Sequence, residues 1–403
     1  MAKIGIYNEP SGTGIGGSES VAAVLAEAFT RGHQVDILHH IDGLSADKLA
    51  DTFGVKLDGV RLRYVPPDYD PKPYFRDPRR RYEAARAWHA GLSEGYDLFI
   101  AIVHGVPPFC HAARGALIVL FPFDAAAHIQ PRGEILAKSA LRRRVETAYQ
   151  KWEWKRRMSG YQLKTAISEF SREWARRRWD IDCRVIYPPV EGGFRRAEKS
   201  DTVLSVGRFA LEGEGHTKRQ PEMLACFGDL AEGELGGWEY FCVGGLRDSP
   251  KHRAFFDRLR AVVPGGRAHV VANIGRCELK GLYERAKIFW HAAGYGEDEQ
   301  ASPESMEHFG ISTVEAMAAG CVPVVINRGG QREIVRHGVD GFLWETLDEL
   351  REYTLRVARD EPLRARMSES ARERARLFSR EAFVGRFKES LRPLFDDGGK
   401  TFD

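Results

Sequence analysis

Two successive series of short apolar runs, each run separated from the next by a helical segment, constrain the fold of this chain most. The first series opens with an apolar run over 4–7, a glycine-rich loop, a helical pattern over 18–30 and a second apolar run over 34–38. This order is that of a β-α-β unit, in which parallel strands pair side by side. The series therefore predicts a doubly wound α/β domain. Further strands are expected at 60–65, 98–103, 117–121, 165–168 and 185–187, with helices near 79–92 and 134–158.

A second series of the same kind follows a break at 188–199, where two prolines and two glycines interrupt every regular pattern. A chain of 403 residues is too long for one compact core, so two domains are expected. We predict two Rossmann-like, doubly wound parallel-sheet domains over 1–190 and 200–375, and a helical segment over 376–403 that packs back toward the N-terminal domain. Strands of the second series are expected at 202–206, 239–243, 268–271, 288–290 and 322–326, with helices near 220–230, 250–262, 278–286 and 312–319.

The composition is that of a folded globular enzyme, with 43% hydrophobic and 29% charged residues. The longest nearly uninterrupted apolar run, 316–326, is about half of the roughly 20 residues that a membrane-spanning helix needs. The N-terminus lacks the apolar core of a secretory signal, so we expect a cytoplasmic protein. The six cysteines form no C-x-x-C pair, which favours reduced structural thiols.

Positive charge is concentrated in one segment of a chain whose net charge is only +3. Residues 138–199 hold three arginine- and lysine-rich clusters interleaved with tryptophans. Such a segment could lie on an anionic membrane surface, which would place the protein peripherally on the inner membrane face, or grip an acidic acceptor. The alternative is a solvated helical face whose tryptophans point into the core. No nucleic-acid partner is expected.

Two carboxylates eight residues apart, Glu307 and Glu315, bracket a transition from loop to helix around Gly310. The unpaired N–H groups at the start of such a helix can hold a diphosphate. A carboxylate accepts hydrogen bonds from two neighbouring hydroxyls, so one acid can reach sugar hydroxyls and the other a ribose. The segment predicts a site for a nucleotide sugar.

Two cations follow the first strand of the second series. Arg208 ends that strand and Lys218 precedes the next helix. Both could stabilise a diphosphate leaving group without a metal, so neither a metal nor another cofactor is expected. The Asp-Ile-Asp triplet at 180–182, a pattern that binds metal elsewhere, falls between a helix and a strand in the other half and is interpreted as structural.

The glycine-rich loop at 12–17 has the G-x-G-x-x-G spacing of a dinucleotide site. The loop is longer than a tight turn, and Asp36 lies inside the second strand, so the fit is weak. Glu19 falls in the first turn of the next helix, where the helix dipole stabilises a carboxylate. Polar groups at other strand ends, which are favoured ligand positions, are His104, Asp124, His128 and His291.

Several of these segments, in the same order, resemble the family-4 retaining glycosyltransferases of the GT-B fold. Residues 307–315 are similar to the family's E-x7-E signature, and Gly16 and Gly17, with the following Ser-Glu, resemble its N-terminal G-G-x-E loop. Also similar are segments 168–171, 185–190, 206–209 and 329–335. The resemblance covers nearly the whole chain and implies two domains that face each other across a cleft.

The resemblance also implies roles for individual residues. Glu307 would contact the donor hexose, Glu315 the ribose, and Arg208 and Lys218 the diphosphate. Backbone groups of Phe309, Gly310 and Ile311 would hold the sugar and phosphates, and Gly16 and Gly17 would line the cleft from the other domain. The reaction would retain the anomeric configuration, with the leaving phosphate assisting attack on the same face.

This chain departs from the family pattern at two places. The spacing from Arg208 to Lys218 is longer than usual, and Asp124 stands near the strand end where many members carry a histidine. The predicted donor is a UDP- or GDP-linked hexose, such as mannose or glucose, and the acceptor a sugar, glycan or lipid-linked molecule. Two alternatives are an NAD-dependent oxidoreductase, resting on the loop at 12–17, and a non-catalytic protein that binds sugar nucleotides or a membrane surface.

Overall fold

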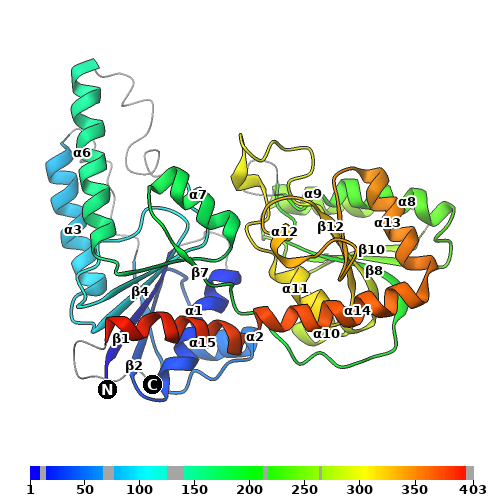
Figure 1. Cartoon of the computed structure of the whole chain (residues 1–403), viewed down its shortest axis with the longest axis horizontal. Helices are drawn as coiled ribbons and strands as arrows, with labels where there is room; N and C mark the ends of the chain where they lie inside the picture. The colour runs from blue at the N-terminus through cyan, green and yellow to red at the C-terminus, as the bar shows by residue number, and fades with distance from the viewer. Residues whose placement is uncertain (10–14, 67–76, 125–139, 212–216, 263–265, 396–403) are drawn as a thin grey trace. The chain divides into compact units, whose positions relative to one another are not determined.

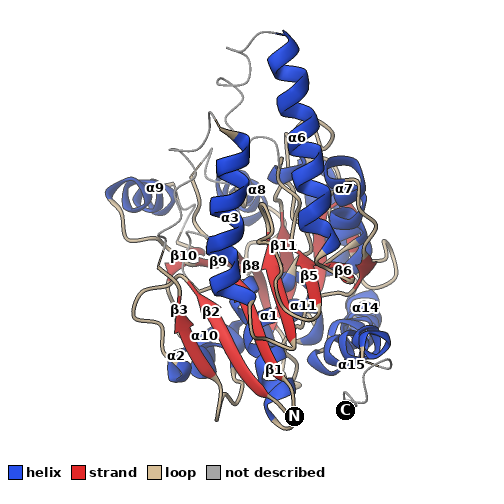
Figure 2. Ribbon diagram, turned by 90° about the vertical axis from the view of Figure 1, so that its left-hand side faces the viewer, coloured by secondary structure: helices blue, strands red, loops and turns tan. Residues whose placement is uncertain are grey.

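The computed structural model describes residues 1–9, 15–66, 77–124, 140–211, 217–262 and 266–395. The chain divides into two compact units, one formed by Met1–Pro189 with Phe383–Asp403 and the other by Val190–Ala382. Each unit is built around one parallel sheet whose strands form the inner layer, with helices outside it (Figures 1 and 2). This confirms the predicted class of two parallel-sheet α/β domains.

The first unit holds a seven-stranded sheet in the order β3-β2-β1-β4-β5-β6-β7, and every strand pairing in it is parallel. The chain moves outward from β1 to β3 and then returns to the other side of β1, so the order reverses between β1 and β4. All residues of β4 are buried, as expected of a central parallel strand covered on both faces. The strands are β1 (Lys3–Asn8), β2 (Gln34–His39), β3 (Arg61–Tyr64), β4 (Leu98–Val103), β5 (Gly115–Val119), β6 (Leu163–Ala166) and β7 (Arg184–Val185).

Two helices of the first unit begin at serine caps that the sequence supplies. Ser45 accepts a hydrogen bond from the N–H of Lys48 at the start of α2, and Ser168 accepts one from Ser171 at the start of α7. Near the end of the chain, Ser390 on α15 accepts a hydrogen bond of 2.8 Å from Arg184, which fixes the last helix against β7. The helices are α1 (Gly17–Thr30), α2 (Ala46–Phe53), α3 (Pro78–Ser93), α6 (Ala140–Ser159), α7 (Glu169–Trp179) and α15 (Arg380–Leu391).

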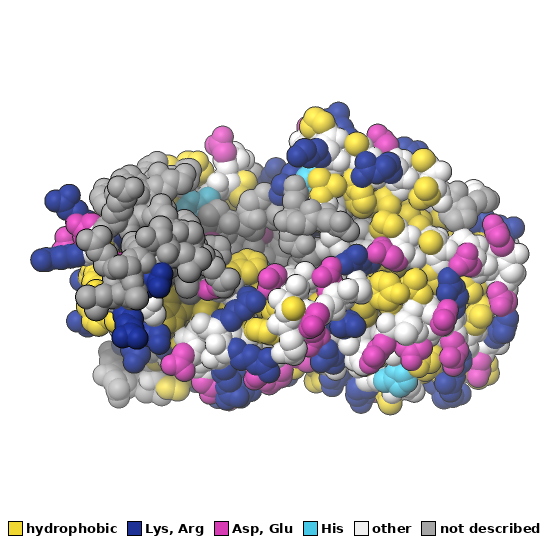
Figure 3. Space-filling model, turned by 90° about the horizontal axis from the view of Figure 1, so that it is seen from above, with side chains coloured by type: hydrophobic (Ala, Val, Ile, Leu, Met, Phe, Trp, Pro, Cys, Tyr) yellow, Lys and Arg dark blue, Asp and Glu magenta, His cyan; other side chains and the backbone are white. Residues whose placement is uncertain are grey.

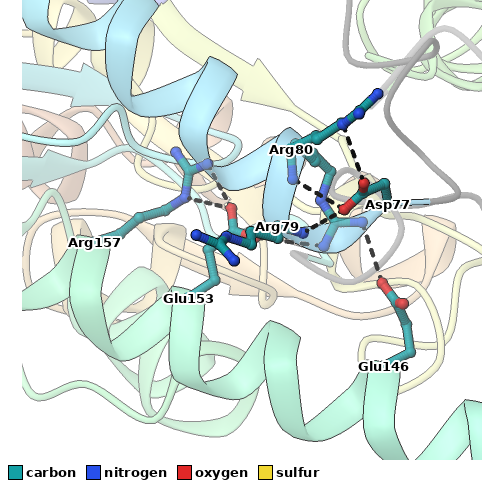
Figure 4. A network of polar contacts seen from close by, with 7 residues as sticks. Asp77, Arg79, Arg80, Glu146, Glu153 and Arg157 are labelled. Atoms are coloured by element: carbon teal, nitrogen blue, oxygen red, sulfur yellow. Dashed lines mark hydrogen bonds and ion pairs between the residues drawn. The ribbon is translucent and has the colours of Figure 1, made fainter.

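Helices α3 and α6 lie side by side and project from the first unit (Figures 1 and 2). Buried charges join them: Arg81 on α3 lies 3.2 Å from Glu146 and 3.4 Å from Glu153, and Glu153 also pairs with Arg157 at 2.8 Å (Figure 4). Two positive and two negative groups balance each other inside the helix pair. Because removing one partner would leave a buried charge unpaired, the network fixes how the two helices pack.

The second unit holds a six-stranded sheet in the order β10-β9-β8-β11-β12-β13, again with parallel pairings only. The order reverses between β8 and β11, and the carboxyl ends at such a reversal are where open α/β sheets bind ligands. The strands are β8 (Ser200–Val206), β9 (Glu239–Gly244), β10 (Ala268–Ala272), β11 (Ala286–His291), β12 (Val322–Ile326) and β13 (Phe342–Trp344).

An aromatic core supports the centre of this second sheet. The ring centroid of Trp290 on β11 lies 5.5 Å from that of Tyr240 and 6.4 Å from that of Phe227. Its Nε1 donates a 2.9 Å hydrogen bond to Thr354. All residues of β12 are buried. The helices are α8 (Gln220–Glu232), α9 (Pro250–Ala261), α10 (Arg276–Arg285), α11 (Ile311–Ala318), α12 (Gln331–Ile334), α13 (Leu347–Arg359) and α14 (Glu361–Ala375).

Element boundaries differ from the sequence expectation where no loop separates two elements. Helix α10 ends at Arg285, and β11 begins at the next residue, whereas the helix was expected to reach 286 and the strand to begin at 288. Ala286 has extended backbone angles, so the chain passes directly from helix to strand. The three-residue strand β13 was not expected, because it is too short to show a pattern.

Surface properties of the described residues are those of a mixed-charge protein. Acidic and basic side chains are interspersed over the second unit on the face drawn in Figure 3. None of the helices that the structure describes is both long and apolar enough to cross a bilayer.

Candidate active site

Four of the residues singled out by sequence lie around the carboxyl ends of β8 and β11, where the strand order reverses. Arg208 follows β8 by two positions and Lys218 lies just before α8. His291 is the last residue of β11, and Glu307 lies in the loop that leads to α11. A small cavity in the same region is lined by Gly207, Lys218 and His291, among others. Residues distant in sequence therefore converge on the preferred ligand position of this sheet.

Lys218 and His291 each contact Glu307 directly. Lys218 Nζ donates a hydrogen bond to Glu307 Oε2, and His291 Nε2 lies 3.0 Å from the same oxygen. The side chains are nearly enclosed, with exposed fractions of 13% for Lys218, 15% for Glu307 and 3% for His291. A charged pair with this little solvent interacts more strongly than a surface pair, and its remaining exposure leaves room for a ligand.

His291 is neutral in this arrangement. Burial lowers the pKa of His291, the hydrogen bond and charge of Glu307 raise it, and the charge of Lys218 lowers it further. Because a carboxylate only accepts hydrogen bonds, the proton of the neutral ring belongs on Nε2. His291 is thus a neutral donor to Glu307, whereas Lys218 is a charged one.

Glycines hold the loop between Glu307 and Gly310 in place. Gly310 precedes α11 with a φ of 122°, and a Cβ there would lie 2.4 Å from the side-chain nitrogen of Gln331. Gly330 donates its N–H to the carbonyl of Glu307 at 2.8 Å, and a Cβ on Gly330 would lie 2.6 Å from the Cα of Phe309. Only glycine fits at these positions, so the loop carrying Glu307 is fixed by backbone packing.

Helix α11 starts without a side-chain cap, at Ile311. The side chain of Phe309 is buried and contacts the ring of Phe378 at 5.5 Å, which leaves only its backbone for a ligand. The first turn of α11 carries no acidic residue. Its N–H groups therefore provide positive polarity next to Glu307, a typical place for a phosphate.

Glu315 lies inside α11, and its hydrogen-bond partner differs from those of Glu307. Its Oε2 accepts a 2.9 Å hydrogen bond from the hydroxyl of Tyr283 on α10. Burial raises the pKa of Glu315 to about 7, although the hydrogen bond from Tyr283 and the charge of Arg276 lower it. The two acids of the sequence pattern thus lie in two different environments.

Lys218 can lie against the end of β8 because residue 207 is a glycine. A Cβ on Gly207 would lie 2.7 Å from Lys218 Cγ. Arg208 is exposed, its carbonyl accepts a 3.0 Å hydrogen bond from Gln220, and its guanidinium makes no ion pair with the residues that the structure describes. Most of the insertion between Arg208 and Lys218, residues 212–216, lies outside the described part of the chain.

In the first unit, Gly16 and Gly17 stand at the start of α1. Glu19 is buried, and its carboxylate accepts hydrogen bonds from the N–H of Gly16 at 2.7 Å, from Asn8 at 2.8 Å and from Ser18 at 3.0 Å. These contacts make Glu19 part of the helix cap. The other glycines of the loop, 12 and 14, lie outside the described residues.

Asp36, the acid that a dinucleotide site would use, is engaged within the protein. It is buried in β2, where its carboxylate accepts hydrogen bonds from Tyr96 at 2.6 Å and from Arg61 at 3.0 Å. Both oxygens therefore already have partners. The geometry does not favour the oxidoreductase alternative.

Sequence reasoning missed Glu9, which follows β1 directly. Its Oε2 accepts hydrogen bonds from the backbone N–H groups of His104 at 2.6 Å and Gly105 at 2.8 Å, at the end of β4. Burial raises the pKa of Glu9, and these two hydrogen bonds lower it. The sequence indicated only that an acid directly follows a strand. It could not indicate the partners of Glu9, because nearly every residue carries a backbone N–H.

Asp124 lies half-buried in the segment that follows β5. It comes directly after Phe123, whose ring stacks on His104 with centroids 5.5 Å apart. Asp124 and His104 thus belong to the carboxyl edge of the first sheet, while His128 lies outside the described residues.

The Asp-Ile-Asp triplet belongs to the end of α7. Asp180 is the C-cap residue, with a left-handed φ of 53°. Asp182 Oδ1 lies 3.1 Å from Arg176 and 3.4 Å from Arg172. Desolvation raises the pKa of Asp182, but the charges and hydrogen bonds of the two arginines together lower it below its usual value. Its carboxylate is used in ion pairs.

The basic segment combines buried and exposed tryptophans. Trp174 and Trp179 are buried, and Trp154 donates a 2.9 Å hydrogen bond to the carbonyl of Trp179. In contrast, Trp152 is 42% exposed and Val145, on the same helix α6, is 63% exposed. The exposed face of α6 also carries the basic residues Arg144, Lys151, Lys155 and Arg156.

Two family models together match most of the chain. The model described as Glycosyltransferase Family 4 matches residues 15–191, and the model described as Glycosyl transferases group 1 matches residues 192–374. The boundary between the matches falls next to Val190, where the second unit begins.

A curated relative matches over part of the chain. The sequence is 28% identical over 236 residues to the GDP-Man:Man(3)GlcNAc(2)-PP-Dol alpha-1,2-mannosyltransferase of Dictyostelium discoideum. The match covers 55% of this chain and 44% of that protein, so the chain spans less than half the length of the relative it matches.

Solved structures match over nearly the whole chain. Sucrose-phosphate synthase from Thermosynechococcus elongatus is similar with a TM-score of 0.64 and 17% identity, covering 99% of this chain and 100% of that one. HepE of Anabaena, solved in complex with UDP and glucose, has a TM-score of 0.62 and 16% identity, covering 97% and 99%. At these identities the likeness is one of fold.

Proposed function

Because this chain belongs to glycosyltransferase family 4 and has the GT-B fold, we propose that it transfers a hexose from a nucleotide-diphosphate sugar with retention of configuration and without a metal. The observation that carries the proposal is the contact of Lys218 and His291 with Glu307 beside the start of α11. This arrangement offers a cation, a helix start and an acid, which match the phosphate and the hydroxyls of such a donor.

The second unit would bind the donor. Lys218 and Arg208 would hold the diphosphate together with the backbone of Phe309, Gly310 and Ile311. Lys218 is enclosed and acts as a point charge, whereas the exposed guanidinium of Arg208 can offer two parallel N–H groups to phosphate oxygens. Glu307 would then accept hydrogen bonds from the hexose.

The remaining site residues would contact the ribose of the donor and the acceptor. Glu315 would bind the ribose, since its carboxylate is partly exposed beside Tyr283. Gly16 and Gly17 would bind substrate at the start of α1, and Asp124 would be the polar group that contacts the acceptor.

The chemical step needs no protein nucleophile in this proposal. The bond between the anomeric carbon and the diphosphate oxygen breaks, and its electron pair goes to the diphosphate. The acceptor hydroxyl oxygen forms a new bond to the anomeric carbon on the same face, and its proton passes to the leaving phosphate oxygen. Arg208 and Lys218 stabilise the charge that develops on the diphosphate, the role that Mg²⁺ fills in metal-dependent enzymes.

GDP-mannose is the donor that we propose to test first. The curated relative from Dictyostelium is named as a mannosyltransferase that uses GDP-mannose, and it matches 55% of this chain. UDP-linked hexoses are the second choice, because HepE, which shares the fold, was solved with UDP.

The function is tested by following release of nucleoside diphosphate from GDP-mannose and from UDP-linked hexoses, with and without acceptor sugars. We expect turnover of one donor that is unaffected by EDTA, and a product whose anomeric configuration, measured by NMR, equals that of the donor. Loss of activity with EDTA would contradict metal independence. An inverted product would contradict the retaining mechanism.

We propose further that the exposed face of α6 binds an anionic membrane, where a lipid-linked acceptor would be found. Exposed Trp152 and Val145 can enter the headgroup region, while Arg144, Lys151, Lys155 and Arg156 face anionic lipids. The buried charge network between α3 and α6 makes this face rigid. The name of the Dictyostelium relative includes a dolichol-linked acceptor, which supports a lipid-linked acceptor here.

Vesicle co-sedimentation tests the membrane proposal. We expect the protein to bind vesicles containing phosphatidylglycerol, to bind less at high salt, and to lose binding as the double variant Trp152→Ser with Val145→Ser. Val262→Ser is the matched control, because Val262 is equally exposed, at 62%, in the second unit. Equal binding by the double variant and the wild type would contradict the proposal.

A further inference from the structure

His291 contacts Glu307 from a buried position and has no role in the mechanism above. It ends β11, its side chain is only 3% exposed, and its Nε2 lies 3.0 Å from Glu307 Oε2. Lys218 Nζ donates to the same oxygen. One carboxylate oxygen thus receives two donors, and these donors differ in their freedom to move.

The difference lies in how the two side chains are attached. Lys218 lies in the segment before α8 and reaches Glu307 through a flexible four-carbon stem that rests on Gly207. The ring of His291 is fixed at the end of a strand that pairs with both β8 and β12. Lys218 can therefore move by rotation about several side-chain bonds, whereas rotation of the buried His291 ring about its two bonds is restricted by the packing around it.

A bound diphosphate would compete with Glu307 for Lys218. The diphosphate of a sugar nucleotide carries two negative charges, and an ammonium group binds phosphate oxygens strongly. When Lys218 turns to the diphosphate, Glu307 loses a charged donor. A donor that does not move and stays bound to the same oxygen would help to keep the carboxylate in its orientation.

We infer that His291 is a positioning residue that keeps the Glu307 carboxylate directed at the donor hexose while Lys218 moves from Glu307 to the diphosphate. The inference rests on the proposed function. The charged groups that act on the imidazole are Glu307, which contacts it from the loop before α11, and Lys218, whose charge acts on it from the segment before α8. The ring remains a neutral Nε2–H donor beside them, since burial lowers its pKa. Its Nδ1 has no hydrogen-bond partner among the described residues.

This role affects the sugar part of donor binding and not the diphosphate part. A nucleoside diphosphate without sugar uses Lys218, Arg208 and the start of α11, and does not need an oriented Glu307. A sugar nucleotide needs Glu307 as well. The ratio of the two dissociation constants therefore reports on His291, whereas general damage to the unit would change both.

The experiment measures dissociation constants for GDP and GDP-mannose by calorimetry, together with kcat and KM for the donor, in His291→Phe and His291→Gln. We expect His291→Phe to weaken GDP-mannose binding about tenfold or more and GDP binding by less than about twofold. His291→Gln keeps an N–H donor and should restore most of the difference. Thr354→Val is the control, because it removes the hydrogen bond to Trp290, next to His291, without touching Glu307.

Several results would overturn the inference. It fails if both ligands weaken equally in His291→Phe, if neither changes, or if His291→Gln behaves as His291→Phe does. Should His291→Phe not fold, His291→Asn takes its place, because the shorter amide does not reach Glu307. If the wild type binds GDP-mannose more tightly than GDP, and the His291 variants have the same two dissociation constants as the wild type, the inference falls and the proposed function stands. If the wild type binds no sugar nucleotide of the GDP or UDP series, both fall.

Discussion

The carboxyl edges of the two sheets hold acids in different ways. In the second unit, Glu307 is held by the side chains of Lys218 and His291. In the first unit, Glu9 accepts two backbone N–H groups, and Glu19 caps the start of α1 through Gly16. A lysine side chain can exchange a carboxylate for a phosphate, but a backbone N–H cannot leave its place. The same sheet topology thus carries an acid that can change partners in one unit and acids that fix the backbone in the other.

The largest expected effect comes from Glu307→Gln, which keeps the shape and removes the charge. We expect turnover of the donor to fall on the order of 10² or more, because in the proposed function this acid contacts the reacting sugar. Release of nucleoside diphosphate measures it. Glu352→Gln, an exposed acid on α13, is the matched control. Wild-type turnover in Glu307→Gln would contradict the view that Glu307, unlike the acids at the edge of the first sheet, serves the reaction.

Arg208→Ala should have the next largest effect. We expect turnover to fall by about 10², because charge develops on the diphosphate in the transition state, where the guanidinium acts. Arg208→Lys should recover part of the loss, since a point charge replaces the planar fork. A variant with higher KM and unchanged kcat would show instead that Arg208 acts only in binding.

Glu315 should make donor binding depend on pH. Burial raises its pKa to about 7, so the carboxyl is largely protonated below that pH and cannot accept charge-assisted hydrogen bonds from the ribose. Affinity for the sugar nucleotide, whose diphosphate diester does not titrate near neutrality, should rise up to about tenfold between about pH 6 and pH 8. Glu315→Gln should abolish this dependence, and Glu315→Ala should lose donor binding while the fold stays intact.

The same group has the opposite effect on stability. Its folded-state pKa is above its unfolded value, so its contribution to the free energy of unfolding is present at low pH and is lost as the pH rises through about 7. Urea denaturation of the wild type and Glu315→Gln across this range measures it. Affinity and stability that rise together with pH would contradict the assignment to Glu315.

Glu19→Ala should have the smallest effect on the reaction and act on stability instead. It leaves the N–H of Gly16 without its partner and removes the shorter of the two hydrogen bonds of the Asn8 amide, which costs about 1–3 kcal/mol of stability. Urea denaturation gives the loss, and calorimetry with GDP should give nearly wild-type affinity. A large loss of GDP affinity in a folded variant would show that Glu19 serves the donor and not only the helix cap.

The fold class followed from the sequence because two series of buried strands and helices leave few other arrangements. The positions of Glu307, Arg208 and Lys218 near the ends of helices and strands also followed, whereas their role in donor binding stays a prediction. The sequence did not show which side chain each of these residues contacts. Lys218 and Glu307 are 89 positions apart, and only the strand order brings them together. Glu9 was missed because its donors are backbone groups, which any residue carries.

The most direct test is a crystal structure of the protein with GDP or GDP-mannose bound. We expect a diphosphate at the start of α11, with Lys218 Nζ at roughly 3 Å from a phosphate oxygen and His291 Nε2 still hydrogen-bonded to Glu307. A nucleotide bound away from the carboxyl ends of β8 and β11, with Lys218 still on Glu307, would contradict it.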